Sequence, residues 1–98
     1  MNLASEKLDL ADFKKNPDNY TIVDIRNPSE VEEGKFFNSA ISHPLNELRD
    51  SANKISTDKP IVVHCAGGYR SAAGSSILEK QLKGIKVYDL SDDIEDFK

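Results

Sequence analysis

Short runs of apolar, β-branched residues recur along the chain and are separated by longer, more polar segments. Runs of this length and composition are typical of buried strands. They predict strands at residues 20–25, 40–41, 61–63 and 85–88, and a weaker extended segment around Lys7 and Leu8 predicts a fifth.

Capping residues, prolines and glycines between these runs predict helices. The expected helices cover residues 9–13, 28–33, 46–53, 71–82 and 91–97, with Asp9, Asn27, Asn46 and Ser91 as N-caps and Gly34 and Gly84 as stops. In the longest of them the apolar positions share one face, as in a helix that packs on a sheet: Ala73, Gly74, Ile77, Leu78 and Leu82.

The alternation of strands and helices predicts a parallel sheet, because parallel strands need crossover connections and these are usually helices. We therefore expect an α/β fold of three layers, with a central parallel sheet of about five strands and helices on both faces. A chain of 98 residues suffices for one such domain but not for two, so residues 1–98 are expected to form a single domain.

Charge and composition narrow the possible partners. Seventeen acidic against thirteen basic side chains give a net charge of −4, which disfavours nucleic acid and anionic membrane surfaces as partners. No apolar run approaches a membrane span, and residues 1–10 lack a secretory pattern, so a cytoplasmic protein is expected. One cysteine and two histidines offer no disulfide and no metal-ligand spacing, so we expect neither metal nor cofactor.

The single cysteine, Cys65, lies between a predicted strand and a predicted helix, in a loop suited to binding an anion. Gly67 and Gly68 allow successive N–H groups to face one point, and the helix that begins near Ser71 adds its free N–H groups and positive dipole end. Arg70 adds a permanent charge that can close over an oxyanion. Such a site stabilises a thiolate, a persulfide anion and an anionic leaving group, as sulfur transfer requires.

These residues are assigned two roles. Cys65 and Arg70 are expected to be catalytic, and the surrounding loop is expected to bind the substrate through Ala66, Gly67, Gly68, Tyr69 and Ser71. The Ser71 hydroxyl either bonds to the cysteine sulfur, caps its helix, or does both. A lone cysteine is more often a buried apolar residue, but burial alone explains neither the double glycine nor the arginine that follow it.

The run from Cys65 to Ser71 resembles the active-site loop of rhodanese domains: a cysteine, four loop residues, an arginine and a serine. The strand that ends in Asp24-Ile25-Arg26, followed by Glu30 and Gly34, is similar to the family's Asp-x-Arg strand end and the short helix after it. The resemblance implies a five-stranded parallel sheet, a cysteine that becomes persulfidated, and loop amides that bind the transferred sulfur.

The loop also resembles rhodanese modules attached to metallo-β-lactamase-fold persulfide dioxygenases. This implies a small-molecule sulfur donor and acceptor, with a persulfide dioxygenase or another sulfur-metabolism protein as partner. Two alternatives stay open: a non-catalytic rhodanese-like binding module, and a cysteine-dependent phosphatase. Phosphatases of related fold carry five residues between cysteine and arginine, whereas four separate Cys65 from Arg70.

Three further polar residues adjoin the expected site. Asp24 and Arg26 are two positions apart and therefore share a side of the strand end, where they either support the loop or pair with each other. His64 precedes Cys65, and consecutive strand residues point to opposite faces, so His64 is expected to face away from the thiol as a structural residue.

Overall fold

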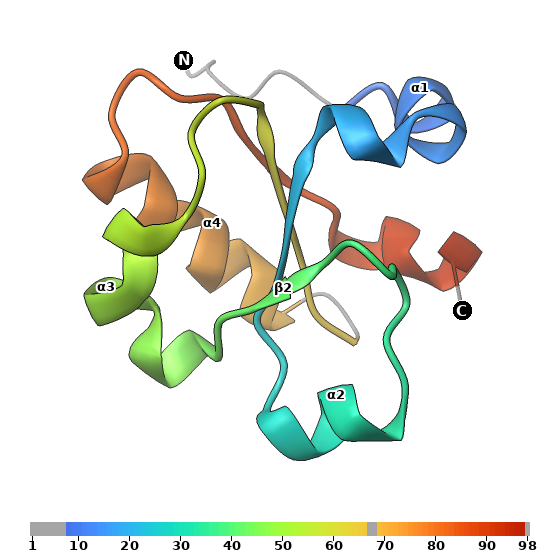
Figure 1. Cartoon of the computed structure of the whole chain (residues 1–98), viewed down its shortest axis with the longest axis horizontal. Coiled ribbons are helices and arrows are strands. Elements are labelled where there is room, and N and C mark those ends of the chain that lie inside the picture. The colour runs from blue at the N-terminus through green and yellow to red at the C-terminus, as the bar shows by residue number, and fades with distance from the viewer. Residues whose placement is uncertain (1–7, 67–68, 98) are drawn as a thin grey trace.

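The computed structural model describes residues 8–66 and 69–97, and its strands and helices alternate along the chain as predicted (Figure 1). The elements, with η for a 3₁₀ helix, are α1 (Leu10–Lys15), η1 (Pro17–Asn19), β1 (Thr21–Asp24), α2 (Pro28–Glu33), β2 (Ile41–Ser42), η2 (Leu45–Glu47), α3 (Leu48–Ser51), η3 (Ala52–Lys54), β3 (Ile61–His64), α4 (Tyr69–Gln81), β4 (Val87–Asp89) and η4 (Ser91–Phe97).

The described strands form one sheet of four parallel strands in the order β2-β1-β3-β4. The α/β fold is therefore confirmed. Of the fifth strand expected around Lys7 and Leu8, Lys7 lies outside the described residues and Leu8 is not in a strand. The central strands β1 and β3 are buried along their whole length and pair from Thr21 with Ile61 to Asp24 with His64.

Helices cover both faces of the sheet, so the three-layer arrangement is confirmed. One core lies on the side of α3 and α4 and contains Val23, Ile25, Leu48, Ala52, Ile55, Ile61, Val63, Cys65 and Leu78. The other lies on the side of α1 and η4 and contains Phe13, Ile22, Phe37, Ala40, Val62, Leu90 and Ile94. Alternate residues of β3 enter alternate cores because strand side chains point to opposite faces.

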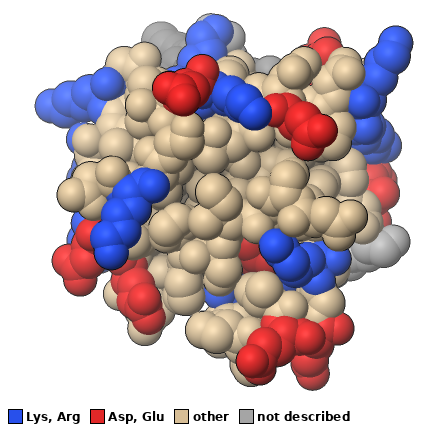
Figure 2. Space-filling model, viewed as in Figure 1, with Lys and Arg blue, Asp and Glu red and all other residues tan. Residues whose placement is uncertain are grey.

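The edge strand β2 carries an exposed hydrophobic side chain, Ile41, which is 45% exposed. Figure 2 shows an uncharged area around the centre of this face, with charged side chains arranged towards its rim. The charged side chains on this face therefore do not form one block.

The longest helix, α4, differs from its prediction in two ways. It begins at Tyr69, two residues earlier than expected, so Ser71 lies inside the first turn and is not the N-cap. Gly74 packs directly on the sheet: a Cβ atom there would lie 2.9 Å from Cδ1 of Ile25 and 3.2 Å from Cγ1 of Val63. Ala73, expected to face the sheet, is exposed.

Several short helices also differ from their predictions. The segment expected to be one helix over residues 46–53 is η2, α3 and η3 in succession, and Asn46 lies within η2 instead of capping a helix. The last segment is 3₁₀ throughout, with Ser91 as its first residue. Short helices are decided by packing more than by propensity, which explains why boundaries and helix type were missed.

Candidate active site

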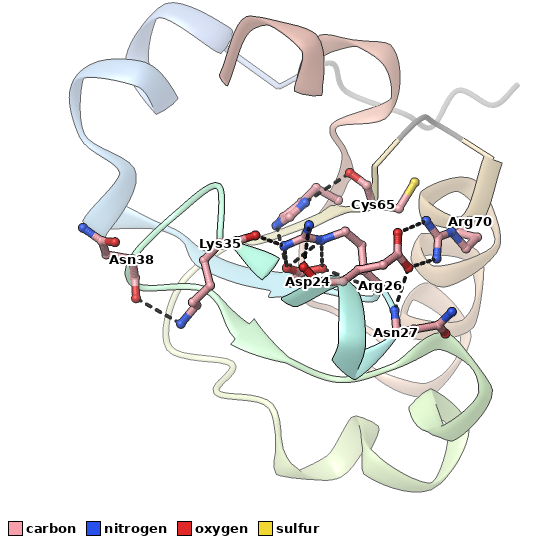
Figure 3. Close-up of polar contacts among 10 residues, drawn as sticks. Asp24, Arg26, Asn27, Lys35, Asn38, Cys65 and Arg70 are labelled. Atoms are coloured by element: carbon pink, nitrogen blue, oxygen red, sulfur yellow. Dashed lines mark hydrogen bonds and ion pairs between the residues drawn. The ribbon is translucent and has the colours of Figure 1, made fainter. Parts of the chain in front are cut away.

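Cys65 follows β3 directly and lies at the carboxyl end of the centre of the sheet. Ligands of open α/β sheets bind at this end, where loops run into helix N-termini. The side chain is only 2% exposed and forms no disulfide. In Figure 3 the sulfur of Cys65 and the guanidinium of Arg70 lie near the same end of α4.

The residues predicted to bind the substrate are only partly described. Ala66 is half-buried, and Ser71 is fully buried in the first turn of α4. Gly67, Gly68 and the side chain of Tyr69 lie outside the described residues. The backbone of Tyr69 begins α4, which has 13 residues, so the positive end of a long helix dipole lies next to the loop.

Arg70 makes a two-point ion pair with Glu30 of α2. Nη1 donates to Oε1 at 2.7 Å and Nη2 donates to Oε2 at 3.0 Å, the fork-to-fork geometry that carboxylates and guanidinium groups prefer. The side chains are 34% and 30% exposed respectively, so the pair lies at the protein surface beside the loop. The Arg70 guanidinium is therefore not a free cation over the cysteine. It is paired with the carboxylate of Glu30, 40 residues earlier in the sequence.

Glu30 is held by a second contact, because its Oε1 also accepts a hydrogen bond of 3.0 Å from the backbone N–H of Asn27 and completes a capping box. Its hydrogen bonds from Arg70 and then from Asn27 lower the pKa of Glu30 to about 2. Glu30 was not predicted as a site residue. A local signal existed, since Asn27-Pro28-Ser29-Glu30 has capping-box spacing, but spacing cannot show that the same carboxylate reaches Arg70.

Asp24 and Arg26 pair with each other, one of the two roles left open by the sequence. Nη2 of Arg26 donates to Oδ2 of Asp24 at 2.7 Å, and both Nε and the backbone N–H of Arg26 donate to Oδ1 at 3.0 Å. Arg26 also donates to the Gly34 carbonyl at 3.0 Å and lies over the Phe36 ring at 4.3 Å. The buried pair thus ties the end of β1 to the segment after α2 (Figure 3).

His64 faces away from the cysteine, as predicted. Its ring packs against those of Phe36 and Phe37, with centroids 5.8 and 5.1 Å apart, whereas Cys65 belongs to the core on the other side of the sheet. Nδ1 lies 3.3 Å from the Cys65 carbonyl, which only accepts, so Nδ1 is the protonated nitrogen of the neutral ring. Burial lowers the pKa of His64 in spite of the nearby Asp24, so the ring is neutral and structural.

Residues 8–66 and 69–97 contain neither a membrane-spanning helix nor a cluster of metal-ligating side chains. No helix in these ranges combines the length and apolar character needed to cross a membrane. The same residues bring no three side chains of the histidine, cysteine, aspartate or glutamate type together as metal ligands.

Comparison with known proteins identifies the class of this fold. The sequence profile of the rhodanese-like domain matches residues 9–98, and the chain therefore belongs to the rhodanese-like domain family.

Solved structures agree with this assignment. A rhodanese-related protein from Thermoplasma volcanium superposes with a TM-score of 0.73 and 35% identity over 87% of this chain and 82% of that one. The human single-domain sulfurtransferase TSTD1 shares the fold with a TM-score of 0.70, at 16% identity, over 87% of this chain and 89% of that one.

Curated relatives are longer than this chain. The tRNA uridine(34) hydroxylase of Ehrlichia ruminantium is 37% identical in an alignment of 93 residues that covers 87% of this chain but 33% of that protein. The chain spans less than half the length of the curated relatives that it matches.

Proposed function

We propose that the protein is a sulfurtransferase in which Cys65 carries a sulfur atom as a persulfide. The observation that carries this proposal is the position of the only cysteine, directly after the central strand β3 and directly before the loop and helix that present Arg70. Membership of a family that includes sulfurtransferases supports it.

The reaction proceeds in two displacement steps. The Cys65 thiolate attacks the outer sulfur of thiosulfate or of an organic persulfide, the S–S bond of the donor breaks, and sulfite or a thiolate leaves with the bonding electron pair. A thiol or cyanide acceptor then attacks the outer sulfur of the Cys65 persulfide. The new S–S bond breaks and Cys65 leaves as the thiolate, so no external oxidant or reductant is needed.

The protein stabilises negative charge on sulfur in both steps. The positive end of α4 lies beside Cys65. In addition, the backbone amides of the loop after Cys65, as proposed from the sequence, donate hydrogen bonds to the negatively charged sulfur. Arg70 contributes less net charge than a free arginine, because Glu30 neutralises part of it. This favours a donor that brings little charge to the point of attack, and we therefore propose an organic persulfide in preference to the doubly charged thiosulfate.

Mass spectrometry of the intact protein tests the proposal. After incubation with glutathione persulfide or thiosulfate and removal of the donor, the protein is expected to gain the mass of one sulfur atom and to lose it on addition of cyanide. Cys65→Ser is the control and must gain nothing. If the wild-type mass stays unchanged with both donors, the enzymatic role is wrong, and a non-catalytic binding module takes its place.

A further inference from the structure

A groove of about 370 Å³ runs along α4 on the side of α3. One of its lining residues, Arg49, comes from α3, and the others come from α4: Ala73, Ser76, Ile77, Lys80 and Gln81. The α4 residues are spaced three, four, seven and eight positions from the first, so they form one face of the helix. Gly74 and Leu78, which are buried against the sheet, lie on the neighbouring face.

The floor of the groove is apolar although it faces solvent. Ala73 is exposed, whereas the sequence pattern predicted that it packs on the sheet, and Ile77 packs against the core on this side of the sheet but stays only half-buried. The apolar face of α4 is therefore wider than the sheet covers. A helix face with this residue spacing and an uncovered apolar strip is suited to holding an amphipathic segment.

The charged residues that line the groove are both positive. Arg49 and Lys80 are exposed, and within the described part of the chain neither forms an ion pair or a side-chain hydrogen bond. The chain as a whole carries a net charge of −4. The groove thus has the opposite sign to the whole molecule, and its cations are available to carboxylates of a partner.

We propose that this groove docks an acidic, amphipathic segment of a partner protein and, resting on the proposed function, that this partner supplies or accepts the sulfur carried by Cys65. Ala73 follows Arg70 by three residues, a rise of about 4.5 Å along a helix. A segment in the groove is therefore close to the mouth of the site. The small groove fits a transient complex, with a dissociation constant on the order of 100 µM.

The acidic C-terminal segment of a second copy is a poorer occupant. Its apolar residues Leu90 and Ile94 are 1% and 0% exposed, because they pack in the core on the side of α1. The half-buried Phe97 packs against the rings of Phe13 and Phe37, so the folded segment offers carboxylates but little apolar surface to Ile77. A long polyanion such as nucleic acid meets the overall negative charge of the chain and lacks the apolar side that the floor requires.

A designed peptide tests the proposal with the whole protein. The probe is a helical peptide of about 16 residues, with leucines on one face and glutamates beside them, and its partner peptide has lysine in place of every glutamate. Titration of the ¹⁵N-labelled protein by NMR is expected to shift amides of α3 and of residues 73–81 with the acidic peptide and not with the basic one.

Charge reversal locates the binding surface. Arg49→Glu and Lys80→Glu are each expected to weaken binding of the acidic peptide, and the double variant by about tenfold or more. The matched control Lys15→Glu makes the same change on α1 and is expected to leave the affinity unchanged. All three positions are exposed, so the folded state should persist, which circular dichroism checks.

Four results would overturn the proposal: no binding of the acidic peptide, equal binding of the basic peptide, equal shifts of the groove amides with inorganic phosphate, or shifts there that grow with protein concentration alone. The last would identify a second copy as the occupant. Sulfur loading of Cys65 in the same variants is scored separately. If the peptide binds but Cys65 gains no sulfur, only the proposed function is refuted. If Cys65 gains sulfur but the peptide does not bind, only the docking site is refuted.

Discussion

Arg70 at the start of α4 and Glu30 in α2 join two elements across the mouth of the candidate site, through hydrogen bonds of 2.7 and 3.0 Å between their terminal atoms. The pair fixes the direction of the guanidinium group. It also sets how much positive charge the site presents to a donor, because part of the charge of Arg70 is offset by the carboxylate beside it.

Neutralising Glu30 should change the donor preference. Wild-type protein is expected to show a higher kcat/KM for glutathione persulfide than for thiosulfate. Glu30→Gln keeps a side chain that can complete the capping box but removes the charge opposite Arg70. We expect the ratio of kcat/KM for thiosulfate to that for glutathione persulfide to rise about fivefold, the effect of roughly 1 kcal/mol.

Steady-state kinetics with both donors at matched ionic strength measure this ratio. Glu32→Gln removes a charge from an exposed position of the same helix and should leave the ratio unchanged. An unchanged ratio in Glu30→Gln would mean that loop amides, and not side-chain charge, select the donor.

Removing Arg70 should slow sulfur transfer without unfolding the protein. Loss of one charge-assisted contact to an anion is worth on the order of 2 kcal/mol, or about tenfold or more in rate, so Arg70→Ala is expected to lose that much in kcat/KM. The double variant Glu30→Gln, Arg70→Ala separates two explanations. Restored activity would show that Arg70 only neutralises Glu30, and persistent loss supports a direct contact with the donor.

Acid should weaken the link between α2 and α4. The pKa of Glu30 is lowered from 4.5 to about 2 in the folded protein, so the unfolded state binds more protons between these values. The ion pair therefore makes its full contribution to the free energy of unfolding above about pH 4.5. This contribution disappears as the pH falls towards 2.

Because both side chains are about one-third exposed, the contribution to the free energy of unfolding should not exceed about 1 kcal/mol. Urea unfolding of wild-type protein and Glu30→Gln between pH 7 and pH 2 measures it. The two proteins should differ at neutral pH and converge in acid. A difference that stays constant over this range would assign the effect of Glu30 to packing.

Loop length leads to a prediction about phosphatase activity. The four residues between Cys65 and Arg70 form a smaller loop than the five of related phosphatases, so hydrolysis of aryl phosphates should not exceed that of Cys65→Ser. Inserting one glycine between Gly67 and Gly68 enlarges the loop and is expected to reduce sulfur transfer. Robust hydrolysis of aryl phosphates by the unmodified protein would favour a phosphatase over a sulfurtransferase.

The features that depend on local periodicity could be predicted from the sequence alone. Alternating strands and helices required a parallel sheet, and the two-residue repeat of β3 placed His64 and Cys65 on opposite faces. The capping residue Asn27 and the proline at the first helical position, Pro28, located the start of α2 to the residue. These signals are local because backbone geometry acts over a few residues, as do the residues that start and end helices.

Which distant groups meet depends on how the elements pack in three dimensions. Glu30 and Arg70 are 40 residues apart, and their pairing depends on how α2 and α4 sit at the same end of the sheet. The start of α4 at Tyr69 and the close approach of Gly74 to Ile25 likewise follow from packing on β1 and β3. A helical pattern shows that Ala73 and Ile77 share a face, but the width of the sheet beneath decides whether that face is covered, because burial is a property of the assembled layers.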